Sequence, residues 1–130
     1  MTSAPTRRAG ELHAVGELRD FPFNRFRVLE VNGRSIGVVR TRHGFYAVRN
    51  SCPHQMAPIC QGRITGTNLP SRPGQVVYGL RDRLLRCPWH GFEFFLETGE
   101  AAFGTSSKRL VTYPVTIVDG LVLVEIRKQG

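Results

Sequence analysis

The 130-residue sequence has little cysteine, few acidic residues and no long hydrophobic run. Its longest purely apolar run is Leu121–Val124, whereas a helix that crosses a bilayer needs about 20 apolar residues. The pair Arg7-Arg8 is followed by Glu11 and His13 instead of an apolar stretch, which argues against a twin-arginine export signal. Three cysteines do not make a disulfide framework, and a chain of this length can bury a core without one. We therefore expect a cytoplasmic protein that does not interact with membranes.

The shortage of acidic residues leaves a strongly basic chain. Ten Asp and Glu stand against 18 Lys and Arg, giving a formal net charge of +8. Residues 1–60 have nine basic and four acidic side chains, residues 61–90 have five and one, and residues 91–130 have four and five. The positive excess lies in the first two thirds of the chain, where it suits either acidic protein partners or nucleic acid.

Helix signals are nearly absent, and β-branched and aromatic runs alternate with turn residues from residue 11 onward. Asn32-Gly33 suits a type I′ turn because both central residues of that turn need positive φ. Pro114 predicts an edge strand or a bulge. This pattern predicts an antiparallel all-β fold, with residues 1–10 as a flexible tail and residues 11–130 as a single domain. Further hairpin signals are His43-Gly44 and Asp119-Gly120, and the predicted strands span residues 25–31, 34–40, 45–49, 84–86, 93–96, 110–118 and 121–127.

Residues 52–54 and 87–91 each combine a cysteine and a histidine on a short Pro-containing loop. Two thiolates and two imidazoles suit a metal centre, and zinc, copper and iron all accept such donors. Structural zinc sites commonly have two cysteines two to four residues apart, followed by two histidines. Here each loop is mixed, which matches a binuclear cluster with one cysteine-bound and one histidine-bound iron. The predicted ligands are Cys52, His54, Cys87 and His90.

The spacing Cys52-x-His54 and Cys87-x-x-His90 resembles the Rieske motif, in which two histidines replace two cysteines on one iron of a 2Fe–2S cluster. The resemblance covers about residues 11–127 and points to Rieske ferredoxins and to the Rieske domains of aromatic-ring-hydroxylating oxygenases. It implies a Rieske-type antiparallel β-sandwich with a small cluster-binding subdomain of two ligand loops, at about residues 50–106. It also implies one 2Fe–2S cluster, with both cysteines on the inner iron and both histidines on the outer iron. Besides the ligand motif, the similar segments are residues 33–36, 45–50, 52–55, 87–94 and 98–100.

The sequence departs from the family in the distance between its two loops. Thirty-two residues separate His54 from Cys87, about twice the usual number in the family. We assign the surplus to an insertion at about residues 63–83, which reads as an extended loop or an additional hairpin. Its role stays open between shielding the cluster, docking a partner and having no function.

The residues around the predicted ligands bear on the reduction potential. High-potential members of the family have a disulfide and two hydroxyl donors at positions that match Ala57, Trp89, Phe92 and Phe94 here. Because hydrogen bonds to sulfur raise the potential, the resemblance implies a low-potential cluster, at roughly −150 mV.

Three further residues could bind metals or react. Cys60 is either a redox sensor or substitute ligand, or a partly buried free thiol beside the first loop, and we expect the free thiol. His13 and His43 are expected to be exposed and to have no role.

The resemblance implies a one-electron carrier, not an enzyme by itself. It would pass electrons from a reductase to a terminal oxygenase, and the basic charge suggests acidic docking surfaces on both partners, without nucleic acid. A small Rieske subunit of a larger oxidoreductase is the alternative. A structural zinc module with a basic nucleic-acid-binding face is the alternative from another class. The oligomeric state stays open.

Overall fold

The computed structural model describes residues 10–53, 58–69, 77–88, 92–102 and 108–126. Within these ranges the chain forms strands and two 3₁₀ turns, and contains no α-helix. The all-β prediction is confirmed. The strands are β1 (Glu11–Glu17), β2 (Phe26–Val31), β3 (Arg34–Thr41), β4 (Gly44–Arg49), β5 (Arg63–Leu69), β6 (Val77–Arg86), β7 (Glu93–Phe95), β8 (Thr112–Tyr113), β9 (Val115–Val118) and β10 (Leu121–Ile126), and the turns are η1 (Leu18–Asp20) and η2 (Ile59–Gln61).

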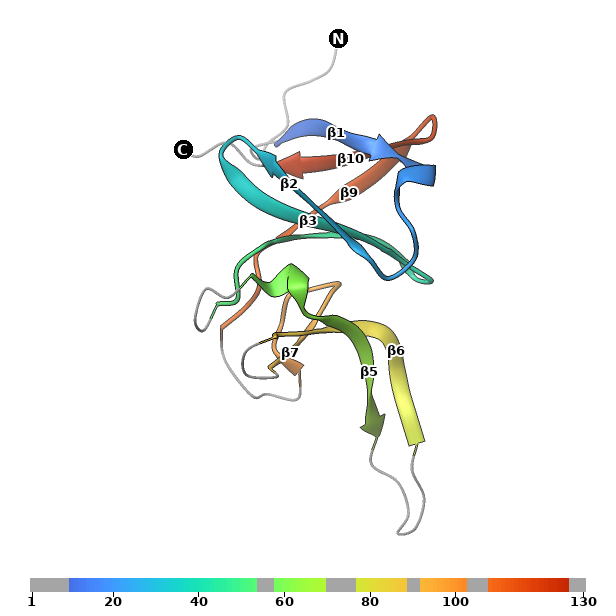
Figure 1. The fold of residues 1–130 in the computed structure, drawn as a ribbon, viewed down its shortest axis with the longest axis vertical. Coiled ribbons are helices and arrows are strands. Elements are labelled where there is room, and N and C mark those ends of the chain that lie inside the picture. The colour runs from blue at the N-terminus through green and yellow to red at the C-terminus, as the bar shows by residue number, and fades with distance from the viewer. Residues whose placement is uncertain (1–9, 54–57, 70–76, 89–91, 103–107, 127–130) are drawn as a thin grey trace, which may run out of the picture.

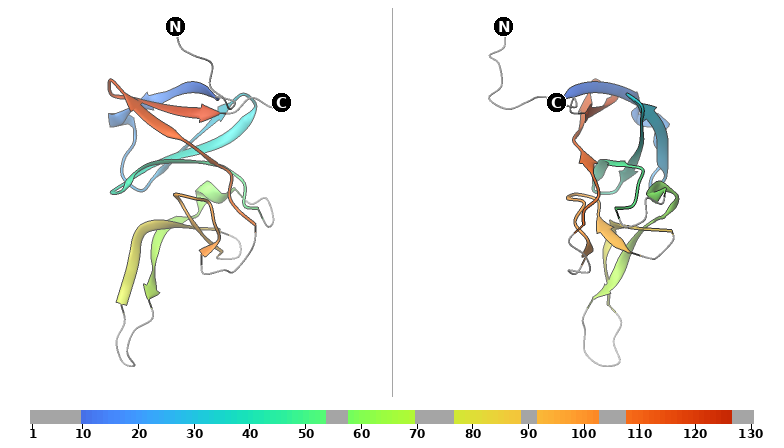
Figure 2. Two further views of the ribbon diagram at one scale, coloured as in Figure 1. Left: turned by 180° about the vertical axis from the view of Figure 1, so that it is seen from behind. Right: turned by 90° about the vertical axis from the view of Figure 1, so that its left-hand side faces the viewer.

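The strands form three antiparallel sheets, with the orders β1-β10-β9, β2-β3-β4-β8 and β5-β6-β7. The first two sheets pack face to face at one end of the molecule, here called the sandwich end (Figure 1). The third sheet lies at the other end, here called the metal end, where β5 and β6 project as a long hairpin (Figure 2). This hairpin occupies the segment that the sequence assigned to an insertion at about residues 63–83.

The central strand β3 is buried on both faces. Ile36 and Val38 pack in the core of the sandwich end, whereas Val39 packs in the core of the metal end. Successive side chains of a strand point to opposite faces, so one strand contributes to both cores. Gly37 lies on the Val39 side, where a Cβ would collide with the thiol of Cys60. The two ends of the molecule therefore share a rigid middle layer.

Local residues set the chain reversals of the sandwich end. Asn32 and Gly33 have φ values of 51° and 77°, and Asp119 and Gly120 have 51° and 78°, as type I′ turns require. Pro114 lies between β8 and β9, where the chain leaves the second sheet and joins the first. Both flanking strands are edge strands, so the edge position predicted for Pro114 is confirmed.

Candidate metal centre

Two buried cysteines begin the two predicted ligand loops. Cys52 follows the end of β4 and Cys87 directly follows β6, and they are 0% and 2% exposed. Both side chains belong to the core of the metal end, and neither forms a disulfide. The fold therefore brings two thiols from distant parts of the sequence into one apolar core.

The first loop is closed at its base by Asn50. The Oδ1 atom of Asn50 accepts a hydrogen bond from the backbone N–H of Cys60 at 2.9 Å. Its Nδ2 atom donates to Oγ of Ser35 on β3 at 3.2 Å, and its backbone N–H donates to the carbonyl oxygen of Ser35 at 2.9 Å. Asn50 thus ties both ends of the loop to each other and to the central layer. The predicted ligand His54, within this loop, lies outside the described residues.

The second loop is closed by its own backbone. The N–H of Cys87 donates to the carbonyl oxygen of Phe92 at 2.7 Å, which holds the two ends of the loop together. The predicted ligand His90 belongs to this loop and lies outside the described residues. Phe94 is fully buried in the same core as both cysteines, and Phe92 packs against that core. The side chains at these two positions supply no hydroxyl group to a cluster, while Ala57 and Trp89 lie outside the described residues.

Cys60 is buried and forms no disulfide, and the prediction that it is a free thiol, not a ligand, stays a prediction. It is 8% exposed, and its side chain packs against Gly37 on the central strand. Burial raises the pKa of Cys60 to about 12, so the thiol stays neutral at physiological pH. A neutral thiol is a poor nucleophile, which does not favour a redox-sensor role.

The two remaining histidines differ in exposure. His43 is exposed in the turn between β3 and β4, as predicted. His13 is half-buried, so the prediction that it would be exposed is wrong. It lies opposite the buried Val124 in the β1–β10 ladder, and partners in a ladder share a face, so His13 faces inward. Its Nε2 atom lies 3.7 Å from a carboxylate oxygen of Glu11.

The described donors fit an iron–sulfur centre. A thiolate buried among apolar groups is unfavourable unless a positive charge neutralises it, and a bound metal ion both removes the thiol proton and supplies that charge. Cys52 and Cys87 are buried at the bases of two hydrogen-bonded loops, in an apolar core. When bound, a 2Fe–2S cluster accepts and releases one electron at a time.

A family model described as Rieske [2Fe-2S] domain matches residues 11–114. The chain belongs to this family. This Rieske domain accordingly has a 2Fe–2S cluster as its cofactor, and the family match does not favour the zinc module. Within the described ranges, no helix combines the length and apolar character needed to cross a membrane.

Known proteins with similar sequences differ in how much of their length this chain covers. The chain is 28% identical over 117 residues to apoptosis-inducing factor 3 of Homo sapiens, a match that covers 90% of this chain but only 17% of that protein. It is 28% identical over 109 residues to the ferredoxin component of naphthalene 1,2-dioxygenase/salicylate 5-hydroxylase systems of Ralstonia sp, covering 84% of this chain and 89% of the relative. The chain thus spans nearly all of one relative and about a sixth of the other.

The fold matches a solved ferredoxin structure. The ferredoxin of carbazole 1,9a-dioxygenase from Nocardioides aromaticivorans IC177 superposes with a TM-score of 0.71 at 21% identity, covering 90% of this chain and 98% of that chain. The Rieske-type all-β fold expected from the sequence is confirmed.

Asn50 was not among the predicted site residues. Two signals were available: Asn50 lies two residues before Cys52 and ends the similar segment 45–50, and Asn side chains often hydrogen-bond nearby backbone.

Proposed function

We propose that this Rieske domain is the ferredoxin component of an oxygenase system. It receives one electron from a reductase and passes it to a terminal oxygenase, which performs the substrate oxidation. The observation that carries the proposal is the pair of buried thiols, Cys52 and Cys87, which share one core at the bases of two closed loops. The ferredoxin relative from Ralstonia sp supports it, because the match covers most of both chains. The proposal includes a cytoplasmic location, which cell fractionation tests.

We assign Cys52 and Cys87 to one iron, and His54 and His90 to the other. Residues 11–130 then act as a single domain whose cluster-binding part spans about residues 50–106. The ligand motif supports this assignment, and so does the burial of both cysteines at the starts of their loops.

The cluster has a low potential in this proposal, at roughly −150 mV. Phe92 and Phe94 occupy the positions where high-potential relatives have hydroxyl donors, and a phenyl ring cannot donate a hydrogen bond to sulfur.

Anaerobic purification followed by spectroscopy tests the proposal. We expect a red-brown protein with two iron and two acid-labile sulfide per chain, by the definition of a 2Fe–2S cluster. After reduction it should give a Rieske-type EPR signal, and a redox titration should give a negative midpoint. A colourless protein that contains zinc would contradict the ligand assignment, and a clearly positive midpoint would contradict the low potential.

A small Rieske subunit of a larger oxidoreductase is the second candidate. The match to only 17% of apoptosis-inducing factor 3 favours it, because a similar domain lies within a longer protein there. Size-exclusion chromatography of the protein from its native source distinguishes the two, since a subunit should elute with a larger complex.

A further inference from the structure

Two arginines face each other beside Cys87, at the base of the projecting hairpin. Arg63 on β5 is the register partner of Arg86 on β6, and both side chains are exposed. Opposed residues of an antiparallel pair have Cβ atoms about 4.5–5.5 Å apart on the same face of the sheet, and like charges so placed repel each other. An anion bound between the two guanidinium groups would relieve this repulsion.

Nearby carboxylates leave this pair uncompensated. No ion pair reaches Arg63 or Arg86 within the part of the chain that the structure describes. Glu93 on β7 is the register partner of Arg86 and shares its face, but it is half-buried and forms no ion pair there. Neighbouring arginines do have acidic partners: Arg83 with Glu97 at 3.3 Å, and Arg42 with Asp82 at 3.0 Å.

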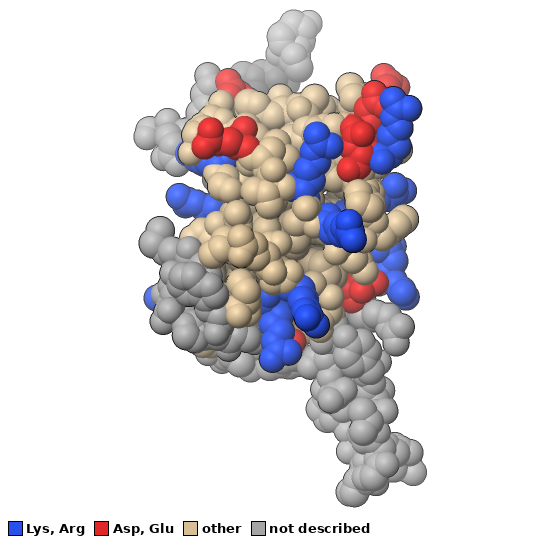
Figure 3. Space-filling model, in the orientation of Figure 1, with Lys and Arg blue, Asp and Glu red and all other residues tan. Residues whose placement is uncertain are grey.

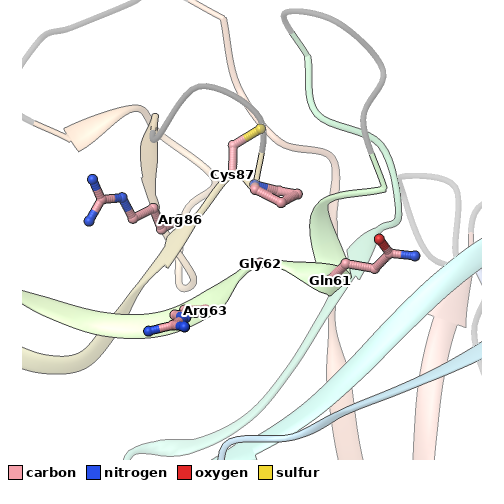
Figure 4. A pocket seen from close by; sticks show the side chains of 6 residues that line it. Gln61, Gly62, Arg63, Arg86 and Cys87 are labelled. Atoms are coloured by element: carbon pink, nitrogen blue, oxygen red, sulfur yellow. The ribbon is translucent and has the colours of Figure 1, made fainter.

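A hollow of about 390 Å³ opens where β5 and β6 begin to pair (Figure 4). A Cβ on Gly62 would collide with the carbonyl oxygen of Arg86, so only glycine permits this close approach of the two segments. In Figure 4 the side chains of Arg63 and Arg86 extend to one side, while the thiol of Cys87 points away from Arg63. The lining residues are Gln61, Gly62, Arg63, Arg86, Cys87 and Pro88.

We propose that Arg63, Arg86 and this hollow are the docking point for an acidic side chain, Asp or Glu, of the protein that exchanges electrons with the cluster. The inference rests on the proposed function. A guanidinium group binds carboxylate through two parallel hydrogen bonds, and two such groups around one hollow suit an acidic loop. Docking here places the partner beside Arg86, the residue that precedes Cys87, a proposed iron ligand.

The distribution of charge favours a protein partner over nucleic acid. On the face seen in Figure 3, basic side chains are scattered singly or in small groups among uncharged and a few acidic ones, and they form no continuous stripe. A nucleic-acid surface needs several cations that follow consecutive phosphates. Arg63 and Arg86 instead form a local positive site that can bind one or two carboxylates.

The test compares the double variant Arg63→Gln/Arg86→Gln with Arg19→Glu. Each of these two proteins has a net charge lowered by two, and Arg19 is an exposed residue of η1 at the sandwich end. Cluster-loaded protein is titrated with hexaglutamate by calorimetry at low and high salt. We expect the double variant to bind hexaglutamate about tenfold more weakly than the unmodified protein does. Arg19→Glu should bind hexaglutamate nearly as tightly as the unmodified protein. Salt should remove the difference, because it screens exposed charges.

A kinetic measurement with a small redox anion gives a second readout. Hexacyanoferrate(III) takes one electron from the reduced protein and becomes hexacyanoferrate(II), and stopped-flow absorbance follows the oxidation. We expect the double variant to react about tenfold more slowly, with unchanged visible and EPR spectra, and Arg19→Glu to react nearly as fast as the unmodified protein. Equal decreases in the oxidation rate of both variants would overturn the proposed docking point, because the change in net charge alone would then explain them.

Two other ligands could occupy the same residues. Orthophosphate that binds more tightly than hexaglutamate would indicate a small-anion site, and a single-stranded oligonucleotide that does so would indicate a nucleic-acid site. Either result would overturn the proposal. A preparation without iron and sulfide would contradict the proposed function instead, while the hexaglutamate titration would still decide whether the arginine pair binds carboxylates.

Discussion

The two ends of the molecule are stabilised by different means. Among the described residues, the core of the sandwich end consists of aliphatic and aromatic side chains and contains no cysteine, whereas the core of the metal end contains all three cysteines of the chain. The sandwich end has seven strands in two facing sheets, and the metal end has three. Apolar burial can therefore hold the sandwich end together by itself, while the metal end depends on thiols, loop closures and contacts to its neighbour.

Removing a proposed iron ligand should produce the largest difference between the two ends of the molecule. We expect Cys87→Ser to abolish cluster binding, because a serine hydroxyl does not replace a buried thiolate. Iron and acid-labile sulfide should fall to background. Hydrogen exchange should show β6 and β7 losing protection, while β10 keeps it because it belongs to the other core.

Cys60→Ala is the matched control, because Cys60 is buried in the same core without being a proposed ligand. We expect it to keep its iron. Full cluster content in Cys87→Ser would show that the ligand assignment is wrong.

Overpacking the middle layer should have the next largest effect. Gly37→Ala places a methyl group against the thiol of Cys60 and should destabilise the protein by about 1–3 kcal/mol. Denaturant unfolding measures the loss. The double variant Gly37→Ala/Cys60→Ala should recover part of it, because removal of the sulfur relieves the collision. Strict additivity of the two substitutions would mean that this contact does not link the ends.

Opening the first loop should affect mainly the metal end. Asn50→Ala leaves the N–H of Cys60 without its acceptor. This should lower the free energy of unfolding by about 1–2 kcal/mol, and a chelator should remove iron faster from the variant. Asn50→Asp retains an oxygen at that place and should keep most of the stability. The proposed closure would be refuted by equal rates of iron loss in both variants.

Weakening a polar contact between the two ends should have a smaller effect. Asp82 on β6 accepts hydrogen bonds from Nε of Arg42 at 3.0 Å and from Nδ2 of Asn24 at 3.1 Å, and both donors belong to the sandwich end. Asparagine tolerates the φ of 61° at position 82, as aspartate does, but it weakens both hydrogen bonds. We expect Asp82→Asn to lower the free energy of unfolding by about 1 kcal/mol.

Arg19→Ala provides a comparison within the sandwich end, where Arg19 pairs with Glu17 at 2.9 Å and is 83% exposed. We expect Arg19→Ala to lower the free energy of unfolding by at most about 0.5 kcal/mol, since exposed ion pairs contribute little to stability. Thermal unfolding measures this change. A larger loss than for Asp82→Asn would reverse the ranking of the two contacts.

Features that depend on adjacent residues could be predicted from the sequence. Asn32-Gly33 and Asp119-Gly120 adopt positive φ wherever they occur in a short hairpin, so their turns were readable without the fold. Pro114 lacks the N–H that a central strand needs, which fixed its edge position. The ligand motif likewise depends on spacing within each loop.

Features that depend on distant residues could not be predicted in this way. The hydrogen bond from Asn24 to Asp82 joins residues 58 positions apart, and no local pattern signals it. Strand β1 was not identified because its ladder with β10 shifts register between Ala14 and Gly16, which interrupts the alternation of side chains. The Gly- and Pro-rich insertion was compatible with a loop or a hairpin. It forms a hairpin, because β5 pairs with β6 in the third sheet.

The double burial of β3 has a consequence for folding fidelity. A slip of this strand by one residue would turn Ile36 and Val38 toward the metal end and Gly37 toward the sandwich core, because side chains alternate between faces. Cys60 would then meet a branched side chain where it now meets glycine, and the loop that begins near Cys52 could not close. Closure of the first loop, which has two of the proposed cluster ligands, therefore depends on the register of the central strand.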